Sequence, residues 1–299
     1  MVHTIDLEFM GAPRAIACYL LAGPAGAVLI ETGPDTTFPR LKGELERLGH
    51  APESIKAVFL THIHLDHAGA AWRFAQMGAT IYVHPKGAPH LVNPEKLLAS
   101  ASRIYGDQMD SLWGKLEPIA AAQVRELHDG EEVAAAGLKL KALETPGHAI
   151  HHHSYLIDNQ IFSGDVGGVR IGSGPCIPPF PPPDIDLEAW RASIQKLGAL
   201  NAEQIYPTHF GGFNDVTGHL EELESYLESW SSWSLAQLKA GIPADAQIGD
   251  FSALVAEAIR SRGLGASEQR EYELADPAFM SVYGLERYWK KHHPEALGG

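Results

Sequence analysis

The sequence contains few of the residues that mark several common protein classes. Only two of the 299 residues are cysteine, Cys18 and Cys176, and they do not form a Cys-x-x-Cys pair. This excludes a disulfide framework and predicts two free thiols in a reducing compartment. The first eight residues contain no basic segment followed by an apolar one, so we expect no signal peptide. Together these observations predict a cytoplasmic protein.

Long apolar runs and positive charge are also scarce. The most apolar stretch, residues 15–30, is interrupted by Gly23-Pro24 and is too short to span a bilayer. Lys and Arg number 23 against 37 Asp and Glu, which gives a formal net charge of −14. Because a surface this acidic repels phosphate backbones, we expect no nucleic acid and no membrane among the partners.

The rest of the composition is that of a globular protein with a sizeable core, since 45% of the residues are hydrophobic and 20% are charged. Apolar runs bounded by turn residues predict strands, and apolar spacing of three and four predicts helices. The predicted strands are residues 15–21, 27–31, 55–60, 79–84, 124–127, 138–144, 153–157, 160–163 and 204–206. The predicted helices are residues 38–48, 68–76, 186–197, 220–239, 251–262 and 278–292.

The predicted elements suggest two domains. Residues 1–217 alternate strands and helices, with a helical insertion at about 85–118 and a proline-rich loop at 175–183 that contains six prolines. Residues 218–299 contain only predicted helices and are expected to form a C-terminal helical subdomain. Its aromatic residues are expected to pack the subdomain together, and a homodimer face is the alternative use for them.

Histidine is abundant, with 16 residues, and four potential metal ligands fall within six positions. The segment Thr61-His-Ile-His-Leu-Asp-His67 directly follows the predicted strand 55–60. Because alternate residues of an extended chain point to the same side, His62 and His64 are expected to face the same way. Imidazoles together with the carboxylate of Asp66 form a typical transition-metal environment.

Three later segments each bring one more potential ligand to the end of a strand or to a tight turn. Thr145-Pro-Gly-His148 presents a histidine, Ser163-Gly-Asp165 an aspartate, and Pro207-Thr-His209 another histidine. Each pattern alone is weak evidence. In this order after the histidine cluster they complete seven ligands, enough for two metal ions.

With these motifs the sequence resembles the metallo-β-lactamase-fold metallohydrolases over residues 15–215. The resemblance implies an α+β fold, a four-layer αββα sandwich with the site at the edge where strands end. It also implies two divalent ions, zinc in the first place, with manganese and iron as alternatives. The implied ligands are His62, His64 and His148 for the first ion, Asp66, His67 and His209 for the second, and Asp165 between them.

The resemblance further implies hydrolysis by a hydroxide held between two metal ions, without a protein nucleophile. Asp66 is the candidate to orient that hydroxide and accept its proton. Two supporting residues are weaker candidates. His152 follows His148 of the Thr145-Pro-Gly-His148 motif by four positions. Glu31 stands where the family usually has an aspartate below the metals.

Within the family, Asp165 argues against a true β-lactamase, and the segment after it matches neither glyoxalase II nor the homoserine-lactone lactonases. What remains is a hydrolase of an ester, thioester or lactone-type small molecule. The alternative is a mononuclear iron persulfide dioxygenase of the same fold. A non-catalytic metal-binding protein is disfavoured because no ligand position is lost. The insertion, the proline-rich loop and the C-terminal helices are expected to wall the pocket. Tyr105, Trp113, Arg170 and Phe180 are candidates for substrate contact, and packing within its own segment is the favoured alternative for each.

Overall fold

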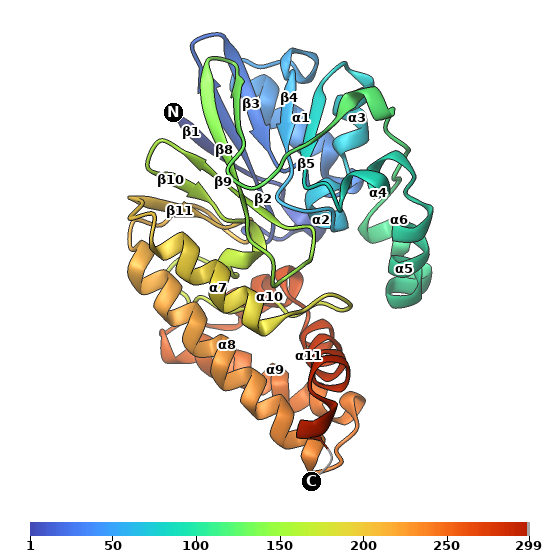
Figure 1. The fold of residues 1–299 in the computed structure, drawn as a ribbon, viewed down its shortest axis with the longest axis vertical. Coiled ribbons are helices and arrows are strands. Elements are labelled where there is room, and N and C mark those ends of the chain that lie inside the picture. The colour runs from blue at the N-terminus through green and yellow to red at the C-terminus, as the bar shows by residue number, and fades with distance from the viewer. Residues whose placement is uncertain (298–299) are drawn as a thin grey trace.

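The computed structural model describes residues 1–297, which form two mixed β-sheets stacked face to face between helices (Figure 1). The first sheet has the strand order β1-β2-β3-β4-β5-β6. Its strands are β1 (Val2–Asp6), β2 (Ala17–Gly23), β3 (Gly26–Ile30), β4 (Ala57–Phe59), β5 (Thr80–Val83) and β6 (Val124–Glu126). Strands β1 to β3 pair antiparallel, and β3 to β6 pair in parallel.

The second sheet has the order β11-β10-β9-β8-β7 and is antiparallel except for the parallel pair β10 and β11. Its strands are β7 (Glu132–Ala135), β8 (Leu138–Glu144), β9 (His153–Ile157), β10 (Gln160–Phe162) and β11 (Gln204–Tyr206). Because β10 and β11 run in parallel, the residues that follow them emerge at the same edge of the sheet.

The four layers follow from the two-residue period of the strands. In β2, Tyr19 packs into the cluster between the sheets, whereas Cys18 and Leu20 belong to the cluster on the outer face. Helices α1 (Phe38–Arg47) and α3 (Ala71–Gln76) supply Leu41 and Phe74 to that outer cluster. The predicted αββα sandwich is therefore confirmed.

Helices from before and after β11 pack on the outer side of the second sheet. They are α7 (Leu187–Gly198), α8 (Val216–Lys239), α9 (Ala244–Ser261), α10 (Ala266–Ala275) and α11 (Ala278–His292). One hydrophobic cluster contains Ile161 of β10, Trp190 of α7, Leu227 of α8 and Leu285 of α11. These helices share their core with the sheet, and the division of the chain at residue 217 stays a prediction.

The predicted insertion is helical, with α4 (Ala88–Val92), α5 (Glu95–Tyr105) and α6 (Met109–Leu112) at the side of the sandwich (Figure 1). The proline-rich loop lies directly against α11, because a Cβ on Gly284 would stand 1.7 Å from the carbonyl oxygen of Phe180. Both cysteines are free and buried. No helix within residues 1–297 is long and apolar enough to cross a membrane.

The structure differs from the sequence prediction in four elements. Strands β1 and β7 and helix α10 were not predicted, since each buries few apolar side chains. The helix predicted at 68–76 is divided into α2 (Leu65–Ala68) and α3 around Gly69. A Cβ on Gly69 would stand 2.4 Å from the carbonyl oxygen of Leu65 and 2.8 Å from Pro34 Cα, so this turn requires glycine.

Candidate metal centre

The seven predicted ligands come together at one edge of the sandwich, each on the segment that follows a strand. His62 and His64 lie between β4 and α2, Asp66 and His67 lie in α2, and Asp165 lies in the 3-10 turn after β10. The remaining two, His148 and His209, follow β8 and β11. Three groups of these side chains have ligand atoms within 4.8 Å of one another, and together the groups include all seven residues.

The first group consists of His62, His64 and His148. His62 Nε2 lies 2.9 Å from His64 Nδ1, and His148 Nε2 lies 3.1 Å from the same atom. His148 donates its Nδ1 proton to the Pro179 carbonyl oxygen at 3.1 Å, so its Nε2 carries a lone pair. Three imidazole nitrogens therefore point at one small volume, an arrangement that a metal cation stabilises.

The position of His148 depends on the glycine before it. Gly147 has φ +137°, and a Cβ there would stand 2.4 Å from Trp190 Cα. Only glycine lets the turn pass this close to helix α7. The Thr145-Pro-Gly sequence thereby fixes the direction in which His148 leaves the sheet.

The second group consists of Asp66, His67 and His209. Asp66 Oδ2 lies 3.5 Å from His67 Nε2 and 3.4 Å from His209 Nε2. His209 donates its Nδ1 proton to the Ala15 carbonyl oxygen at 2.6 Å, which turns Nε2 toward the site. Both ring nitrogens of His67 and Nε2 of His209 are buried without a hydrogen-bond partner.

Asp165 lies between the two groups, with one oxygen facing each. Its Oδ2 is 3.4 Å from His148 Nε2, and its Oδ1 is 3.3 Å from His67 Nε2 and 3.5 Å from His209 Nε2. Oδ1 is buried and has no hydrogen-bond partner. A carboxylate in this position can bridge two cations.

The pKa values of these groups show how strongly the site is polarised. Burial opposes charge on His209, but Asp165 and Asp66 outweigh it and raise its pKa to about 10. The pKa of His67 is raised in the same way by Asp165 and Asp66, against the effect of burial. Burial and the neighbouring His148 lower the pKa of His64 to about 3. The site therefore combines a neutral imidazole at His64 with protonated imidazoles at His67 and His209, which lie beside the two carboxylates.

This donor set fits divalent metal ions. Five imidazoles and two carboxylates are ligands that zinc, manganese and iron accept. Without a cation, the carboxylates of Asp66 and Asp165 are balanced only by the imidazolium forms of His67 and His209. The buried, unpartnered atoms at His67, His209 and Asp165 are the atoms that a metal ion would engage.

Glu31 and His152 form hydrogen bonds with residues that are next to ligands in the sequence. Glu31 Oε1 accepts hydrogen bonds from the backbone N–H and the hydroxyl of Thr61 and lies 3.4 Å from His67 Nδ1. His152 accepts a hydrogen bond at Nε2 from the Val166 N–H at 3.4 Å, one residue after Asp165. Such contacts hold ligands in the orientation that binds metal.

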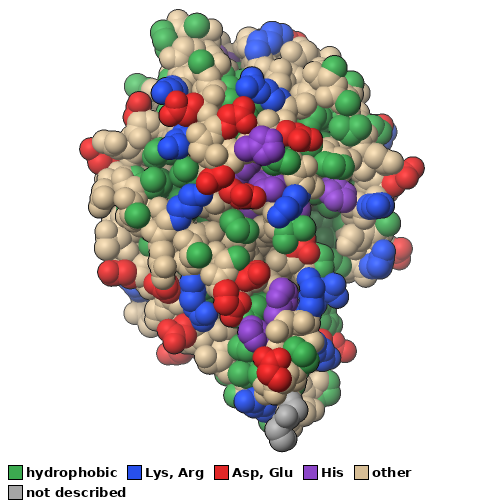
Figure 2. All heavy atoms as spheres, in the orientation of Figure 1, with side chains coloured by type: hydrophobic (Ala, Val, Ile, Leu, Met, Phe, Trp, Pro, Cys, Tyr) green, Lys and Arg blue, Asp and Glu red, His purple; other side chains and the backbone are tan. Residues whose placement is uncertain are grey.

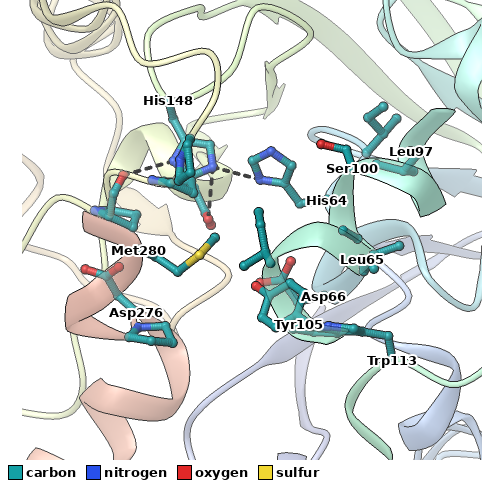
Figure 3. Close-up of a pocket in the computed structure, with 18 of the residues that line it drawn as sticks. His64, Leu65, Asp66, Leu97, Ser100, Tyr105, Trp113, His148, Asp276 and Met280 are labelled. Carbon is teal, nitrogen blue, oxygen red and sulfur yellow. Dashed lines mark hydrogen bonds and ion pairs between the residues drawn. The ribbon is translucent and has the colours of Figure 1, made fainter. Parts of the chain in front are cut away.

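A cavity of about 410 Å³ opens in front of the ligands, between the helical insertion and α10–α11 (Figure 3). Among the predicted substrate contacts, Tyr105 and Trp113 line it, with ring centroids 5.0 Å apart. Arg170 and Phe180 do not line it and are packed within the protein, which is the role expected for them over substrate contact. Phe180 is fully buried against Trp190, and Arg170 lies over the Phe213 ring.

The cavity wall also includes residues that sequence reasoning missed. Lys86 and Lys96 come from the insertion, whereas Asp276 and Met280 come from the C-terminal helices (Figure 3). These residues belong to no motif, and only the packing of α5 and α11 around the site brings them together. Burial raises the pKa of Asp276 well above its ordinary value.

Comparison with known proteins agrees with this geometry. A family model described as the metallo-beta-lactamase superfamily matches residues 11–209. The metallo-beta-lactamase fold-containing protein ST1585 of Sulfurisphaera tokodaii is 26% identical over 70% of this chain and 78% of its own length. The lactamase-like protein adaB of Aspergillus niger is 28% identical over 74% of this chain, which spans 58% of adaB.

Solved structures show the same fold over nearly the whole chain. A metallo-beta-lactamase family protein of Thermus thermophilus, TTHA1429, superposes with a TM-score of 0.71 at 21% identity and covers 97% of this chain and 93% of its own. The crystal structure of ST1585 superposes with a TM-score of 0.66 at 23% identity and covers 95% of this chain and 98% of its own. The shared fold and the match over residues 11–209 together show that the chain belongs to the metallo-β-lactamase superfamily.

Proposed function

We propose that the protein is a hydrolase that uses two divalent metal ions, zinc in the first place, to cleave an ester, thioester or lactone-type small molecule. The observation that carries the proposal is the position of Asp165, whose two oxygens face two separate groups of ligands. The cavity beside these groups has a volume typical of small-molecule sites.

The proposal assigns a ligand atom to each histidine. His62, His148, His67 and His209 bind through Nε2, and His64 binds through Nδ1, because these are the nitrogens that converge. When bound, two divalent ions lower the pKa of a water and polarise the substrate carbonyl. The family comparison supports metal binding in general terms and leaves the metal and its number to experiment.

Asp66 is the proposed proton acceptor. Its side chain is 20% exposed and lines the cavity, whereas that of Asp165 is only 5% exposed. His67 and His209 lower its pKa to about 2 against the effect of burial, so Asp66 is ionised at neutral pH, as a proton acceptor must be. Glu31, through Thr61 and His67, keeps the neighbouring ligands in place.

Metal analysis combined with a substrate panel tests this function. We expect two zinc or manganese ions per chain and hydrolysis of at least one ester, thioester or lactone, with activity lost in Asp66→Asn. Calorimetric binding of zinc to Asp66→Asn separates the two roles of Asp66, since the variant retains His67 and His209. A protein with one iron per chain and oxygen-dependent turnover would contradict the proposal.

We also propose that the protein is cytoplasmic and that its substrate is a small molecule. The two free, buried thiols support the location, and the volume of the cavity supports the size of the substrate. A fluorescent fusion expressed in the source cell tests the location. Recovery of the fusion outside the cytoplasm would contradict it.

A further inference from the structure

The cavity in front of the metal ligands has an apolar wall and a cationic rim, and the two suggest which substrates fit. The apolar side chains come from three places: the segment after β4, the insertion and the C-terminal helices. They include Leu65, Leu97, Ile104, Trp113, Leu274 and Met280. Figure 2 shows hydrophobic and histidine side chains gathered around a hollow on one face of the molecule.

The cationic rim belongs to the insertion. Lys86 lies between β5 and α4, Lys96 lies in the first turn of α5, and both are exposed and line the cavity. Within residues 1–297 neither lysine has an acidic side chain within ion-pair distance, although acidic residues outnumber basic ones in the chain by 14. His90 of α4 lines the cavity beside them.

The part of the cavity wall that comes from the C-terminal helices contains carboxyl groups that are less readily ionised than usual. Burial raises the pKa of Glu273 and, more strongly, that of Asp276, and Ser281 Oγ donates to Asp276 at 3.1 Å. Asp184 also lines this wall, next to the proline-rich loop. The lysines line the cavity on the side of the insertion and Glu273 and Asp276 line it on the side of the C-terminal helices, so the insertion side attracts anions more strongly.

We propose that the substrate is an amphipathic acyl compound, with an apolar group that fills the cavity and a negative charge on the other side of the scissile bond, held by Lys86 and Lys96. This inference rests on the proposed hydrolase function and narrows its substrate class. The apolar group gains by leaving water, and two lysines without competing partners are free to pair with a carboxylate or phosphate.

A matched set of chromogenic esters tests the class on the metal-loaded protein. The set comprises 3-octanoyloxy-4-nitrobenzoate, 2-nitrophenyl octanoate, which lacks the carboxylate, and the two acetyl homologues. A second set, 4-octyl-2-nitrophenyl hydrogen glutarate and the neutral pentanoate, places the chain on the alcohol side. In one of the two sets we expect kcat/KM to be about tenfold higher for the ester that carries the carboxylate than for its neutral partner. In the first set we also expect it to rise with chain length.

Variants locate the charge contact. In Lys86→Gln/Lys96→Gln, KM for the anionic ester should rise about tenfold, with KM for its neutral partner unchanged. The control Lys239→Gln/Lys291→Gln makes the same change in net charge at the ends of α8 and α11, away from the cavity, and should leave both values unchanged. The effect of the carboxylate should also weaken in high salt.

The outcomes separate the two claims. If neither these esters nor any thioester or lactone of the wider panel is hydrolysed by the metal-loaded protein, the proposed hydrolase function fails. If the neutral and acetyl esters are hydrolysed as well as the amphipathic ones, the function stands and the substrate class is wrong. An equal effect of both lysine pairs would also overturn the proposed contact.

Discussion

Metal binding to this site should release protons, because the metal-free protein holds them on two of the ligands. Both ring nitrogens of His67 face carboxylates, with Nδ1 3.4 Å from Glu31 and Nε2 3.3 Å from Asp165. His209 donates Nδ1 to a carbonyl oxygen, and its Nε2 faces Asp66 and Asp165. In the metal-free protein each of these two imidazole rings therefore carries a proton on both nitrogens, in agreement with the raised pKa of His67 and the pKa of about 10 for His209.

The remaining ligands hold no proton that metal must displace at neutral pH. Burial lowers the pKa of His62 and that of His148, and the pKa of His64 falls to about 3. Asp66, with a pKa of about 2, is ionised. Metal-bound imidazole carries no second proton. Filling both sites at about pH 7.5 should thus release at least about two protons per chain, one each from His67 and His209.

Isothermal titration of zinc into metal-free protein measures this number. The observed enthalpy is recorded in buffers with different ionisation enthalpies, and the slope gives the protons released. In His209→Gln the count should fall by about one. A count below one in the unmodified protein would show that His67 and His209 are neutral before metal binds, which would refute the electrostatic account of the site.

Three further predictions follow from individual residues. Replacing Asp165 with Asn removes the bridging charge, so metal analysis should show less than two ions per chain and activity should fall by roughly 100-fold or more; full occupancy with full activity would contradict the bridging role. Glu31→Gln should weaken zinc affinity about 10- to 100-fold by loosening His67, while leaving the melting temperature of the metal-free protein nearly unchanged; calorimetry showing unchanged affinity would contradict this. Gly147→Ala should lower stability by about 2 kcal/mol or more, because its Cβ would clash with Trp190, and a denaturant midpoint equal to that of the parent would show that the turn can move.

The metal-free protein should also lose stability at alkaline pH. The folded-state pKa of His209 is raised from 6.5 to about 10, so the stability that its proton contributes is complete below 6.5 and is lost as pH rises through 10. Melting temperatures of the chelated protein across this range measure the effect. A melting temperature that stays constant or rises from pH 7 to 10 would be inconsistent with an imidazolium at this position.

The convergence of the seven candidate ligands could be predicted from sequence because each lies within a few residues of a strand end. Thr61–His67 follows β4 and Pro207–His209 follows β11, so periodicity places both at the edge of a sheet. The role of Glu31 could not be predicted in this way. Its contact with Thr61 and His67 depends on a backbone turn at φ +63°, which no propensity of glutamate indicates.

The cavity wall could be predicted only as whole segments, because its individual residues come from parts of the chain that are far apart in the sequence. Lys96 and Met280 are 184 positions apart in the sequence, and only helix packing brings them to one cavity. Arg170 and Phe180 were candidates on the basis of loop position alone. The structure instead packs Phe180 against Trp190 because the proline-rich loop lies against α11.

The metal content of the purified protein tests the central claim most directly. The protein is expressed without added metal, passed through gel filtration, and analysed by plasma mass spectrometry against protein concentration. The account predicts two zinc or manganese ions per chain, bound by the seven side chains around Asp165. One iron per chain with no second ion, or no tightly bound metal under any loading condition, would contradict it.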